Sequence, residues 1–451
     1  MNIIIAGGGK VGLSLAGKLA SEGHNLTLIE QNQSVLNAAV EKYDAIGVFG
    51  NCASKEVLLQ AGVKNADLLI ATAGEDEVNL LCCMTAHGIH KNLHTIARIR
   101  NPQYTQQVMT MRNVFPLSLT VNPERRTAKE IERLLRYPGF LRRDTFAKGR
   151  AEIVELRIDA QSKLRDVPLS NLSSIVKCRV LVCAVLRDGA AVAPSGSFVL
   201  RESDRIFVTA PTTDLEVMLK NLGIITRKAR QVLLCGGGRV SYYLAELLAK
   251  DKISVKILEQ NYDRCVELAT LLPNAEIIHG DCSNQAMLDA QGIRGCDALV
   301  TLTGLDESNM VISLYGSNCG VPQVITKISR EENAAIADTL ALGSVVSPNE
   351  LSCNIIVRYV RAMQNQTGAA MSVHSFADGQ VEAVEFLVDS NTINCGVPLK
   401  QINLKSNVLI ASITHGATTQ VPNGDSVFTP GDTVVVTSGR GALYQLNDIF
   451  D

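Results

Sequence analysis

The chain repeats itself once, and this duplication constrains its architecture more than any other feature of the sequence. Residues 3–11 (IIIAGGGKV) return as residues 232–240 (VLLCGGGRV), and residues 152–159 (EIVELRID) return as residues 382–389 (EAVEFLVD). The two matches lie at nearly equal offsets of 229 and 230 residues. Because a long internal repeat indicates a repeated structural unit, we expect two copies of one folding unit.

Shorter matches show that each copy contains two unlike parts. Residues 50–52 return as residues 280–282 in the first part, and residues 167–169 (VPL) return as residues 397–399 in the second. The chain of 451 residues is also too long for one hydrophobic core, because domains average about 150 residues. We therefore expect two domains in each copy.

Short β-branched runs alternate with amphipathic stretches in the first part of each copy. After the first run, Val11, Leu15 and Leu19 recur every four residues, which predicts a helix with one apolar face. Such alternation is typical of a doubly wound parallel sheet. The predicted strands of the first copy are Asn2–Ala6, Asn25–Ile29, Ala45–Phe49, Asp67–Thr72 and Thr95–Ile99.

The second part of each copy has a different pattern. Short strands are separated by turns such as Arg187–Gly189 and Thr429–Asp432, with one helical segment, which predicts a small α+β domain. A helical pattern joins the two parts, over Glu124–Arg136 in the first copy and Glu350–Met363 in the second. The first of these helices is expected to stop at Tyr137–Gly139.

These patterns place the chain in the α/β class, with two Rossmann-like doubly wound parallel-sheet domains, each followed by a small α+β domain. Each crossover helix and its linker stand between the two kinds of domain. The expected boundaries are 1–123 and 229–348 for the Rossmann-like domains, 124–150 and 349–380 for the crossover helices with their linkers, and 151–228 and 381–451 for the small domains.

A Gly-x-Gly-x-x-Gly motif lies between a predicted strand and a predicted helix at the start of the chain. In such a turn the first glycine permits a tight bend, the second lets the backbone approach a pyrophosphate, and the third lets helix and strand pack closely. The amino end of the helix adds N–H groups and the positive end of its dipole. The candidate phosphate site is the backbone of Gly7, Gly8, Gly9, Lys10, Val11 and Gly12.

Glu30 ends the next predicted strand, 18 residues after Gly12. A carboxylate at this position accepts hydrogen bonds from ribose hydroxyls and repels a 2′-phosphate. No arginine directly follows Glu30. The motif therefore favours NAD(H) or an adenine nucleotide such as ATP or ADP over NADP(H).

The second copy departs from this motif because Ser241 replaces the third glycine. Close packing of helix and strand is less assured there. Two interpretations stay open, a second nucleotide site and a degenerate domain kept for structure. The residues that would bind a nucleotide are Gly236, Gly237, Gly238, Arg239, Val240 and Glu259.

Residues that follow other strands are further candidates, because ligands of open α/β sheets bind at the carboxyl ends of the strands. Arg98 and Arg100 can contact phosphates. The run Glu75–Glu77 is instead expected to stabilise the first turn of the following helix. The remaining candidates are Asn51, Cys52, Ala73 and Gly74 in the first copy, and Asp281, Cys282, Thr303, Gly304 and Lys327 in the second.

The composition limits the classes of function. The formal net charge is −2 and 46% of the residues are hydrophobic, which is ordinary for a globular protein and gives no support for nucleic-acid binding. Every apolar run is shorter than the roughly 20 residues that a membrane-spanning helix needs. The strand predicted at Asn2–Ala6 leaves no room for a cleavable signal, so we expect a cytoplasmic protein.

We expect no metal site. The twelve cysteines are scattered through apolar segments without a Cys-x-x-Cys pair, so buried reduced thiols are favoured. His87, His90 and His94 have a spacing that can align three imidazoles on one helix face. Gly88 and the strand predicted from Thr95 favour a loop there instead.

We also expect no catalytic residues. A dehydrogenase needs a second domain that closes over the nicotinamide and supplies an acid, a base or a metal. The small domains offer only His374 and His415 near such a position. Two nucleotide domains joined to two small domains suit ligand sensing, in which binding energy shifts one domain relative to another. An NAD-dependent oxidoreductase remains the alternative.

With these features the chain resembles the TrkA family, the regulatory subunits of Trk potassium-uptake systems, which carry tandem pairs of RCK nucleotide-binding and C-terminal domains. The resemblance covers essentially the whole chain. It rests on the duplication, on Gly7–Gly12 with Glu30, on residues 67–79, 97–100 and 121–124, and on the Val-Pro-Leu and Pro-x-Gly motifs of both small domains.

The resemblance implies a cytoplasmic protein, peripheral at the inner face of the cell membrane. It implies a homo-oligomeric ring, a tetramer with a dimer as its building unit, beneath a TrkH-type potassium-translocating membrane protein. NAD(H) and ATP or ADP would compete at the glycine turn, with Arg98 and Arg100 as phosphate contacts. A regulator of a different cation channel or exchanger would have the same sequence pattern, so that alternative stays open.

Overall fold

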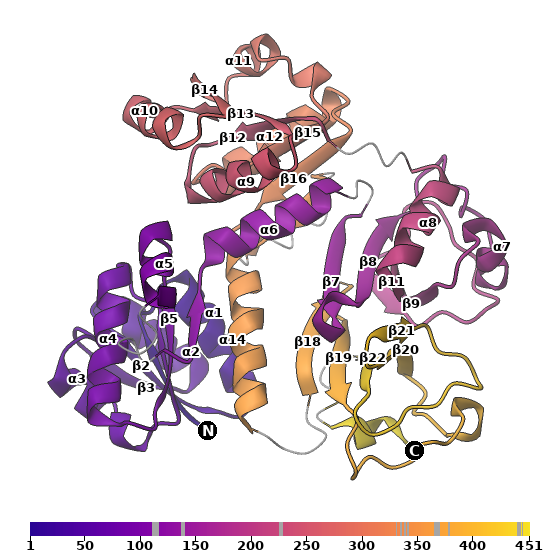
Figure 1. Ribbon diagram of the computed structural model, residues 1–451, viewed down its shortest axis with the longest axis horizontal. Helices are drawn as coiled ribbons and strands as arrows, with labels where there is room; N and C mark the ends of the chain where they lie inside the picture. Colours follow the sequence, from indigo (N-terminus) through magenta and orange to yellow (C-terminus); the bar gives the residue numbers. More distant parts are fainter. Residues whose placement is uncertain are drawn as a thin grey trace. The chain divides into compact units, whose positions relative to one another are not determined.

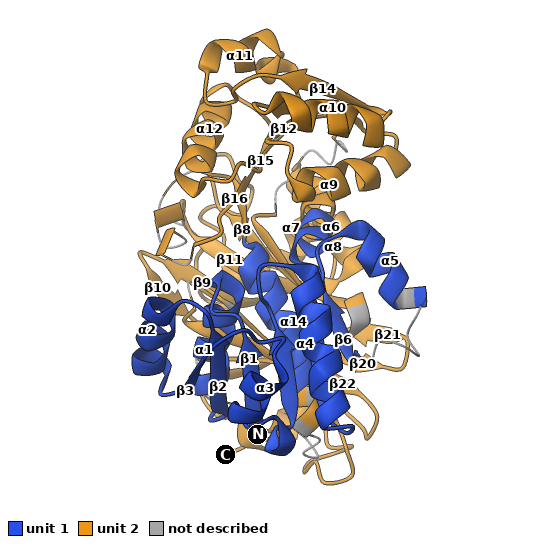
Figure 2. Ribbon diagram, turned by 90° about the vertical axis from the view of Figure 1, so that its left-hand side faces the viewer, with its two compact units in different colours: residues 1–129, 347–360 blue, residues 130–346, 361–451 orange. Residues whose placement is uncertain are grey.

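The structure is a computed structural model that describes residues 1–110, 117–136, 140–224, 229–330, 332–333, 336–337, 340, 342–364, 370–377, 379–439, 443 and 445–451. The stop predicted at Tyr137–Gly139 lies outside these residues. The chain divides into two compact units, coloured separately in Figure 2. The first unit is Met1–Lys129 with Ser347–Val360, and the second is Glu130–Val346 with Arg361–Asp451.

The first Rossmann domain, coloured indigo to purple in Figure 1, is built on six parallel strands. Their order is β3-β2-β1-β4-β5-β6. This order and the intervening helices are those of a dinucleotide-binding fold. The strands are β1 (Asn2–Ala6), β2 (Asn25–Glu30), β3 (Ile46–Phe49), β4 (Leu68–Ala71), β5 (His94–Arg98) and β6 (Leu119–Val121). The helices are α1 (Lys10–Ser21), α2 (Gln33–Tyr43), α3 (Lys55–Gln60), a 3-10 turn (Val63–Asn65), α4 (Asp76–Ile89) and α5 (Pro102–Thr110).

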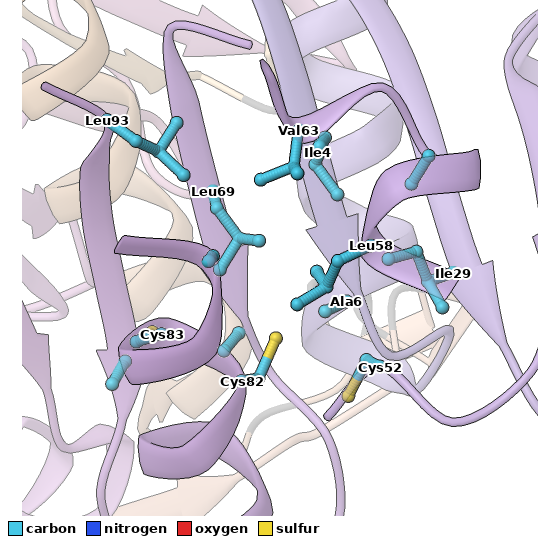
Figure 3. Packing of buried hydrophobic residues seen from close by; sticks show 14 of the residues in the cluster. Ile4, Ala6, Ile29, Cys52, Leu58, Val63, Leu69, Cys82, Cys83 and Leu93 are labelled. Carbon is cyan, nitrogen blue, oxygen red and sulfur yellow. The ribbon is translucent and has the colours of Figure 1, made fainter. Parts of the chain in front are cut away.

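The five strands predicted for this sheet are confirmed to within about one residue at each end. The sixth strand, β6, was not predicted, because three residues are too short to show a period. Strands β1 and β4 are buried along almost their whole length, as expected where helices cover both faces of a parallel sheet. Side chains such as Ile4, Leu69 and Cys82 form one core cluster on a face of this sheet (Figure 3).

The second Rossmann domain repeats the first, with the strand order β14-β13-β12-β15-β16-β17, all parallel. Its strands are β12 (Gln231–Cys235), β13 (Ser254–Glu259), β14 (Ala275–His279), β15 (Ala298–Thr301), β16 (Gln323–Lys327) and β17 (Ser344–Val346). Its helices are α9 (Arg239–Lys250), α10 (Tyr262–Leu271), α11 (Gln285–Ala290), a 3-10 turn (Ile293–Gly295) and α12 (Asp306–Asn318).

The two small domains are five-stranded antiparallel sheets with matching orders, β10-β9-β11-β8-β7 and β21-β20-β22-β19-β18. The first has strands β7 (Arg142–Phe146), β8 (Ala151–Arg157), β9 (Leu181–Arg187), β10 (Ala190–Val192) and β11 (Arg205–Pro211), with α7 (Leu172–Val176), α8 (Thr212–Leu222) and 3-10 turns at Ala147–Gly149 and Leu169–Asn171. The second has β18 (Ala370–Phe376), β19 (Val381–Leu387), β20 (Val408–His415), β21 (Thr418–Gln420) and β22 (Thr433–Gly439), with 3-10 turns at Leu399–Gln401 and Leu446–Ile449.

The predicted α+β class of the small domains is confirmed, but the first contains two α-helices where one segment was expected. Helix α7 is only five residues long, so its period was not visible in the sequence. The hairpin turn predicted at Arg187–Gly189 is confirmed. Asp188 and Gly189 have φ angles of 53° and 77°, the left-handed pair that a tight two-residue hairpin requires.

The two small domains share one hydrophobic core inside the second unit. Phe146 and Phe207 of the first domain and Phe376 of the second are almost completely buried in this cluster. The Phe207 and Phe376 rings lie 4.8 Å apart between centroids. Since three large aromatic side chains bury most of their surface here, the two sheets form a paired body.

The crossover helices are α6 (Pro123–Arg136) and α14 (Pro348–Gln364), and both are where the sequence predicts them. Each packs on the Rossmann domain of the other copy. In the first unit, Lys18 donates to Asn354 of α14 at 2.9 Å, and His94 contacts the Tyr359 hydroxyl at 2.7 Å.

Helix α6 makes the reciprocal contacts within the second unit. Gln323 of the second Rossmann domain donates to the Leu134 carbonyl at 2.7 Å, and Arg136 pairs with Asp251 at 3.1 Å. The exchange could not be predicted, because an apolar helix face does not indicate which copy of a duplicated surface it covers.

Candidate functional site

The first glycine turn connects β1 to α1, and two of its glycines are required by the fold. Gly7 has a φ of +107°, and a Cβ there would lie 2.8 Å from the Ala73 backbone nitrogen. A Cβ on Gly12 would lie 2.0 Å from the Gly7 carbonyl oxygen. Helix α1 therefore packs against the turn more closely than any side chain allows.

Gly9 differs, because nothing in the described fold requires a glycine there. It caps α1 with φ −73° and ψ −177°, which any residue can adopt. Among the residues that the structure describes, no atom would lie within 4 Å of a Cβ on Gly9. A glycine in open space at the amino end of a helix is what close approach of a pyrophosphate to the backbone requires. The cradle therefore fits a dinucleotide.

Glu30 stands beside this turn, at the end of β2. Its carboxylate accepts the Gly8 N–H at 2.5 Å, and its other oxygen accepts the N–H groups of Gln31 and Asn32 at 2.8 and 2.9 Å. The side chain is thereby held at the glycine turn. Its position is the one from which a carboxylate meets a ribose hydroxyl in this fold.

Arg98 and Arg100 follow β5 and reach the loop after β4. Arg98 donates to the Ala73 carbonyl at 2.7 Å, and Arg100 donates to the Gly74 carbonyl. The structure therefore brings these four predicted residues together at the carboxyl edge of the sheet, next to the glycine turn through the Gly7–Ala73 approach. Their role as phosphate contacts stays a prediction.

Asp76 has a more specific role than the helix stabilisation predicted for Glu75–Glu77. It does lie in the first turn of α4, as expected. Its buried carboxylate accepts the N–H groups of Arg100 and Asn101 at 2.8 and 2.7 Å. Asp76 therefore fixes the backbone that carries Arg100.

Asn79 was not among the candidates predicted from the sequence. It is fully buried, and its amide accepts the Ala73 N–H at 2.7 Å and donates to the Arg98 carbonyl at 3.0 Å. Asn309 makes the same contacts with Thr303 and Lys327. The signal was present, because Asn79 and Asn309 recur at the repeat offset. Both residues join two of the strand ends that form the candidate site.

Asn51 and Cys52 follow β3, the neighbour of β2. Asn51 is exposed and accepts the Ala53 N–H at 2.9 Å, whereas Cys52 is buried in the core with Cys82 (Figure 3). The hydrogen bond with Cys82 lowers the pKa of the Cys52 thiol, and the same contact with burial raises the pKa of Cys82. Of these two candidates, Cys52 is therefore part of the hydrophobic core, and only Asn51 is exposed to solvent.

The second glycine turn keeps the geometry of the first. Gly236 has a φ of +103°, and the Gly237 N–H donates to Glu259 at 2.6 Å. Gly238 caps α9, and a Cβ added there would have no atom of the described part of the chain within 4 Å. Ser241 is accommodated, since it is fully buried and its hydroxyl donates to the Gly236 carbonyl. The substitution therefore does not disrupt this turn.

The other second-copy candidates lie at the corresponding strand ends. Lys327 donates to the Leu302 carbonyl at 3.3 Å, and the Thr303 hydroxyl bonds Asn309 at 2.7 Å. The Ser283 N–H lowers the pKa of exposed Asp281. Cys282 packs in the core with Cys235. Arg239 and Val240 open α9, Arg239 exposed and Val240 buried, as Lys10 and Val11 do in α1.

The prediction of a loop around Gly88 is wrong, because α4 continues through Gly88 to Ile89. The helix tolerates this glycine because enough apolar residues of α4 pack on the sheet. His90 contacts the Val63 carbonyl and His94 contacts Tyr359, so the two rings have separate partners. No group of three side chains suited to a metal ion occurs among the residues that the structure describes.

Two glycine turns, each at the start of a helix on a six-stranded parallel sheet, define a duplicated protein of the dinucleotide-binding fold class. The TrkA-N domain model matches residues 3–114 and 232–348, and the TrkA-C domain model matches residues 153–223 and 383–451. The chain belongs to the TrkA family. Over the part of the chain that is described, no helix is long and apolar enough to cross a membrane.

Relatives of this family match along their whole length. The chain is 29% identical to the Trk system potassium uptake protein TrkA homolog 1 of Methanosarcina mazei, covering 100% of both chains. It is 30% identical to the Trk system potassium uptake protein TrkA homolog of Archaeoglobus fulgidus, again covering 100% of both.

Solved structures confirm the fold. The crystal structure of the GsuK RCK domain has a TM-score of 0.62 at 16% identity, covering 97% of this chain and 92% of that chain. The GsuK channel bound to NAD has a TM-score of 0.61 at 16% identity, covering 97% and 76%. Both therefore share the fold of this chain over almost its whole length.

Proposed function

We propose that the protein is a nucleotide-sensing regulatory subunit of a potassium-uptake system. It binds NAD(H), with ATP or ADP competing at the same place, and it gates a TrkH-type potassium-translocating membrane protein. The observation that carries the proposal is Gly9, a glycine that the fold does not need, in open space at the amino end of α1. The relatives' role in potassium uptake supports the regulatory part.

In the first copy, different residues would bind different parts of the nucleotide. The backbone from Gly7 to Gly12 holds the pyrophosphate, and Glu30 accepts hydrogen bonds from the ribose hydroxyls. Arg98 and Arg100 neutralise phosphate charge from the end of β5. In the second copy, Gly236–Val240, Glu259 and Lys327 take the same roles, since that turn has the same geometry.

Regulation requires that a change at a glycine turn reaches other domains. Within the second unit, Gln323 and Asp251 tie the second Rossmann domain to α6. Arg133 of α6 lies 3.9 Å from Glu152 of the first small domain. A shift of the second Rossmann domain on nucleotide binding would therefore move α6 and the small domain with it. We propose that a ring of four chains at the inner face of the membrane passes this movement to the gate.

The nucleotide preference set by Glu30 is the test of this proposal. In a Gly238→Val background, which leaves the first site alone, we expect NADPH to bind at least about tenfold more weakly than NADH, because Glu30 repels the 2′-phosphate. Glu30→Gln should weaken NADH binding by roughly 10-fold to 100-fold, because hydrogen bonds to a charged group are lost. It should also reduce the difference in affinity between NADH and NADPH. Isothermal titration calorimetry measures both.

The matched control for this experiment is Glu41→Gln, at an exposed position of α2, which should leave the affinities for NADH and NADPH unchanged. NADPH binding more tightly than NADH would contradict the role of Glu30. For the regulatory part, deletion of the gene should lower potassium uptake by the cell and the wild-type gene should restore it. Unchanged uptake after deletion would contradict gating of a potassium transporter.

A further inference from the structure

The two small domains contact each other through equivalent residues, as a two-fold related pair does. Gln380 of the second domain donates to the Gly189 carbonyl at 2.7 Å and accepts the Ala191 N–H at 2.9 Å, both at the β9–β10 hairpin. Arg150, which precedes Gln380 by the repeat offset, donates to the Gly416 carbonyl at the β20–β21 hairpin. Each small domain therefore forms hydrogen bonds with the equivalent hairpin of the other.

Asp144 and His374 lie on the pseudo-two-fold axis of this pair. They are equivalent residues, because Asp144 pairs with Ile153 in β7–β8 and His374 pairs with Ala383 in β18–β19, all at an offset of 230 residues. The His374 Nδ1 atom lies 2.9 Å from an Asp144 carboxylate oxygen. Two equivalent residues that touch each other must lie at the axis that relates them.

The charges around this contact keep Asp144 ionised. Burial alone would raise the pKa of the Asp144 carboxyl, but Arg142, at 3.0 Å, and His374 hold it well below its ordinary value. The Asp144 and His374 side chains are only 13% and 10% exposed. Glu130 of α6 also faces this group, and burial raises its pKa. A second carboxylate in place of His374 would therefore face a buried negative charge.

Pairing of two identical small domains would place two identical side chains in this contact. Two first small domains would place Asp144 against Asp144, and two second small domains would place His374 against His374. Only the unlike pair joins a carboxylate to an imidazole, which can donate to it. Phe146 and Phe376 do not discriminate in this way, because these two members of the hydrophobic cluster are also equivalent and are chemically identical.

We propose that Asp144 and His374 restrict pairing to unlike small domains, so that a first small domain accepts only a second one as its partner. The same rule holds within one chain and between chains in an assembly. A repulsive contact against the wrong partner is a common source of pairing specificity. This inference does not depend on nucleotide binding.

The test uses the full-length chain and amide hydrogen exchange at pH 8. His374→Asp should reduce protection of the segment 187–192 at least about tenfold, because the Ala191 amide is held by Gln380 only in the paired state. Segment 205–211, in the centre of its own sheet, should keep its protection. Asp144→His should lose less protection, since it places no second carboxylate in the contact.

The exchanged variant Asp144→His/His374→Asp is the decisive measurement, because it restores the unlike pair in reverse. It should recover the protection of segment 187–192 to within about threefold of the wild type. Lys400→Asp is the control. It places a carboxylate against Asp425 in an exposed pair of the second small domain and should leave segment 187–192 protected. Full protection in His374→Asp, or no recovery in the exchanged variant, would overturn the proposal.

Discussion

Replacing Gly12 by valine is expected to lower the free energy of unfolding of the first Rossmann domain by about 3 kcal/mol, the upper range for overpacking a tightly packed site. Even a Cβ at this position would lie 2.0 Å from the Gly7 carbonyl oxygen, and 3.1 Å from the Thr72 hydroxyl. Helix α1 would have to move away from β1 and β4. Urea unfolding followed by circular dichroism measures the loss.

Two further variants separate this contact from a general effect of replacing glycine. The Cβ added by Gly88→Ala in α4 would have no described atom within 4 Å. This variant should change the free energy of unfolding by less than about 1 kcal/mol, in the stabilising direction. Gly12→Ser should cost less than Gly12→Val, because the second copy accommodates Ser241 with its hydroxyl bonded to Gly236. A Gly12→Val protein as stable as the wild type would show that the close packing is not required.

Arg143→Met is expected to cost about 3–5 kcal/mol of stability, because it leaves a buried carboxylate without its partner. Arg143 of β7 is bonded to Glu152 of β8 through two nitrogens, at 2.9 Å for Nε. Their side chains are only 3% and 5% exposed. Water cannot reach Glu152 to replace the guanidinium. The remaining partners of the carboxylate, Arg133 at 3.9 Å and the Thr212 hydroxyl at 3.3 Å, would compensate its charge only in part.

Arg136, whose ion pairs are exposed, provides the comparison for the loss of a buried ion pair. Arg136 bonds Glu132 and Asp251 but is 46% exposed, so Arg136→Met should cost no more than about 1 kcal/mol. The double variant Arg143→Met/Glu152→Leu should recover most of the loss, since no charge is then left buried. Equal effects of Arg143→Met and Arg136→Met on the urea midpoint would contradict this account of the buried pair.

Much of the fold could be predicted because the duplication allows every pattern to be tested twice. The glycine turns, the strands from β1 to β5 and both crossover helices follow from local periods and turn residues. Gly7 and Gly12 were assigned the correct structural roles because their packing depends on atoms within the same βαβ unit. Whether the second turn tolerates Ser241 could not be predicted, because this depends on the hydrogen bond that its hydroxyl donates to the Gly236 carbonyl.

The parts that could not be predicted depend on contacts between distant segments. The exchange of α6 and α14 depends on which of two similar surfaces each helix covers, and both surfaces have the same pattern in the sequence. The Asp144–His374 contact appears only when the two small domains are paired about an axis. Asn79 looked like an ordinary helix residue, because its partners lie in the β4 and β5 loops.

Calorimetric titration of NADH into Gly9→Val/Gly238→Val, beside the wild type, tests the central claim most directly. Because a Cβ at either position would have no atom of the described residues within 4 Å, we expect the variant to fold as the wild type does and to bind NADH at least about 100-fold more weakly. Each single variant should remove binding at its own turn. NADH binding to the double variant with wild-type affinity would show that the nucleotide does not lie against these glycines.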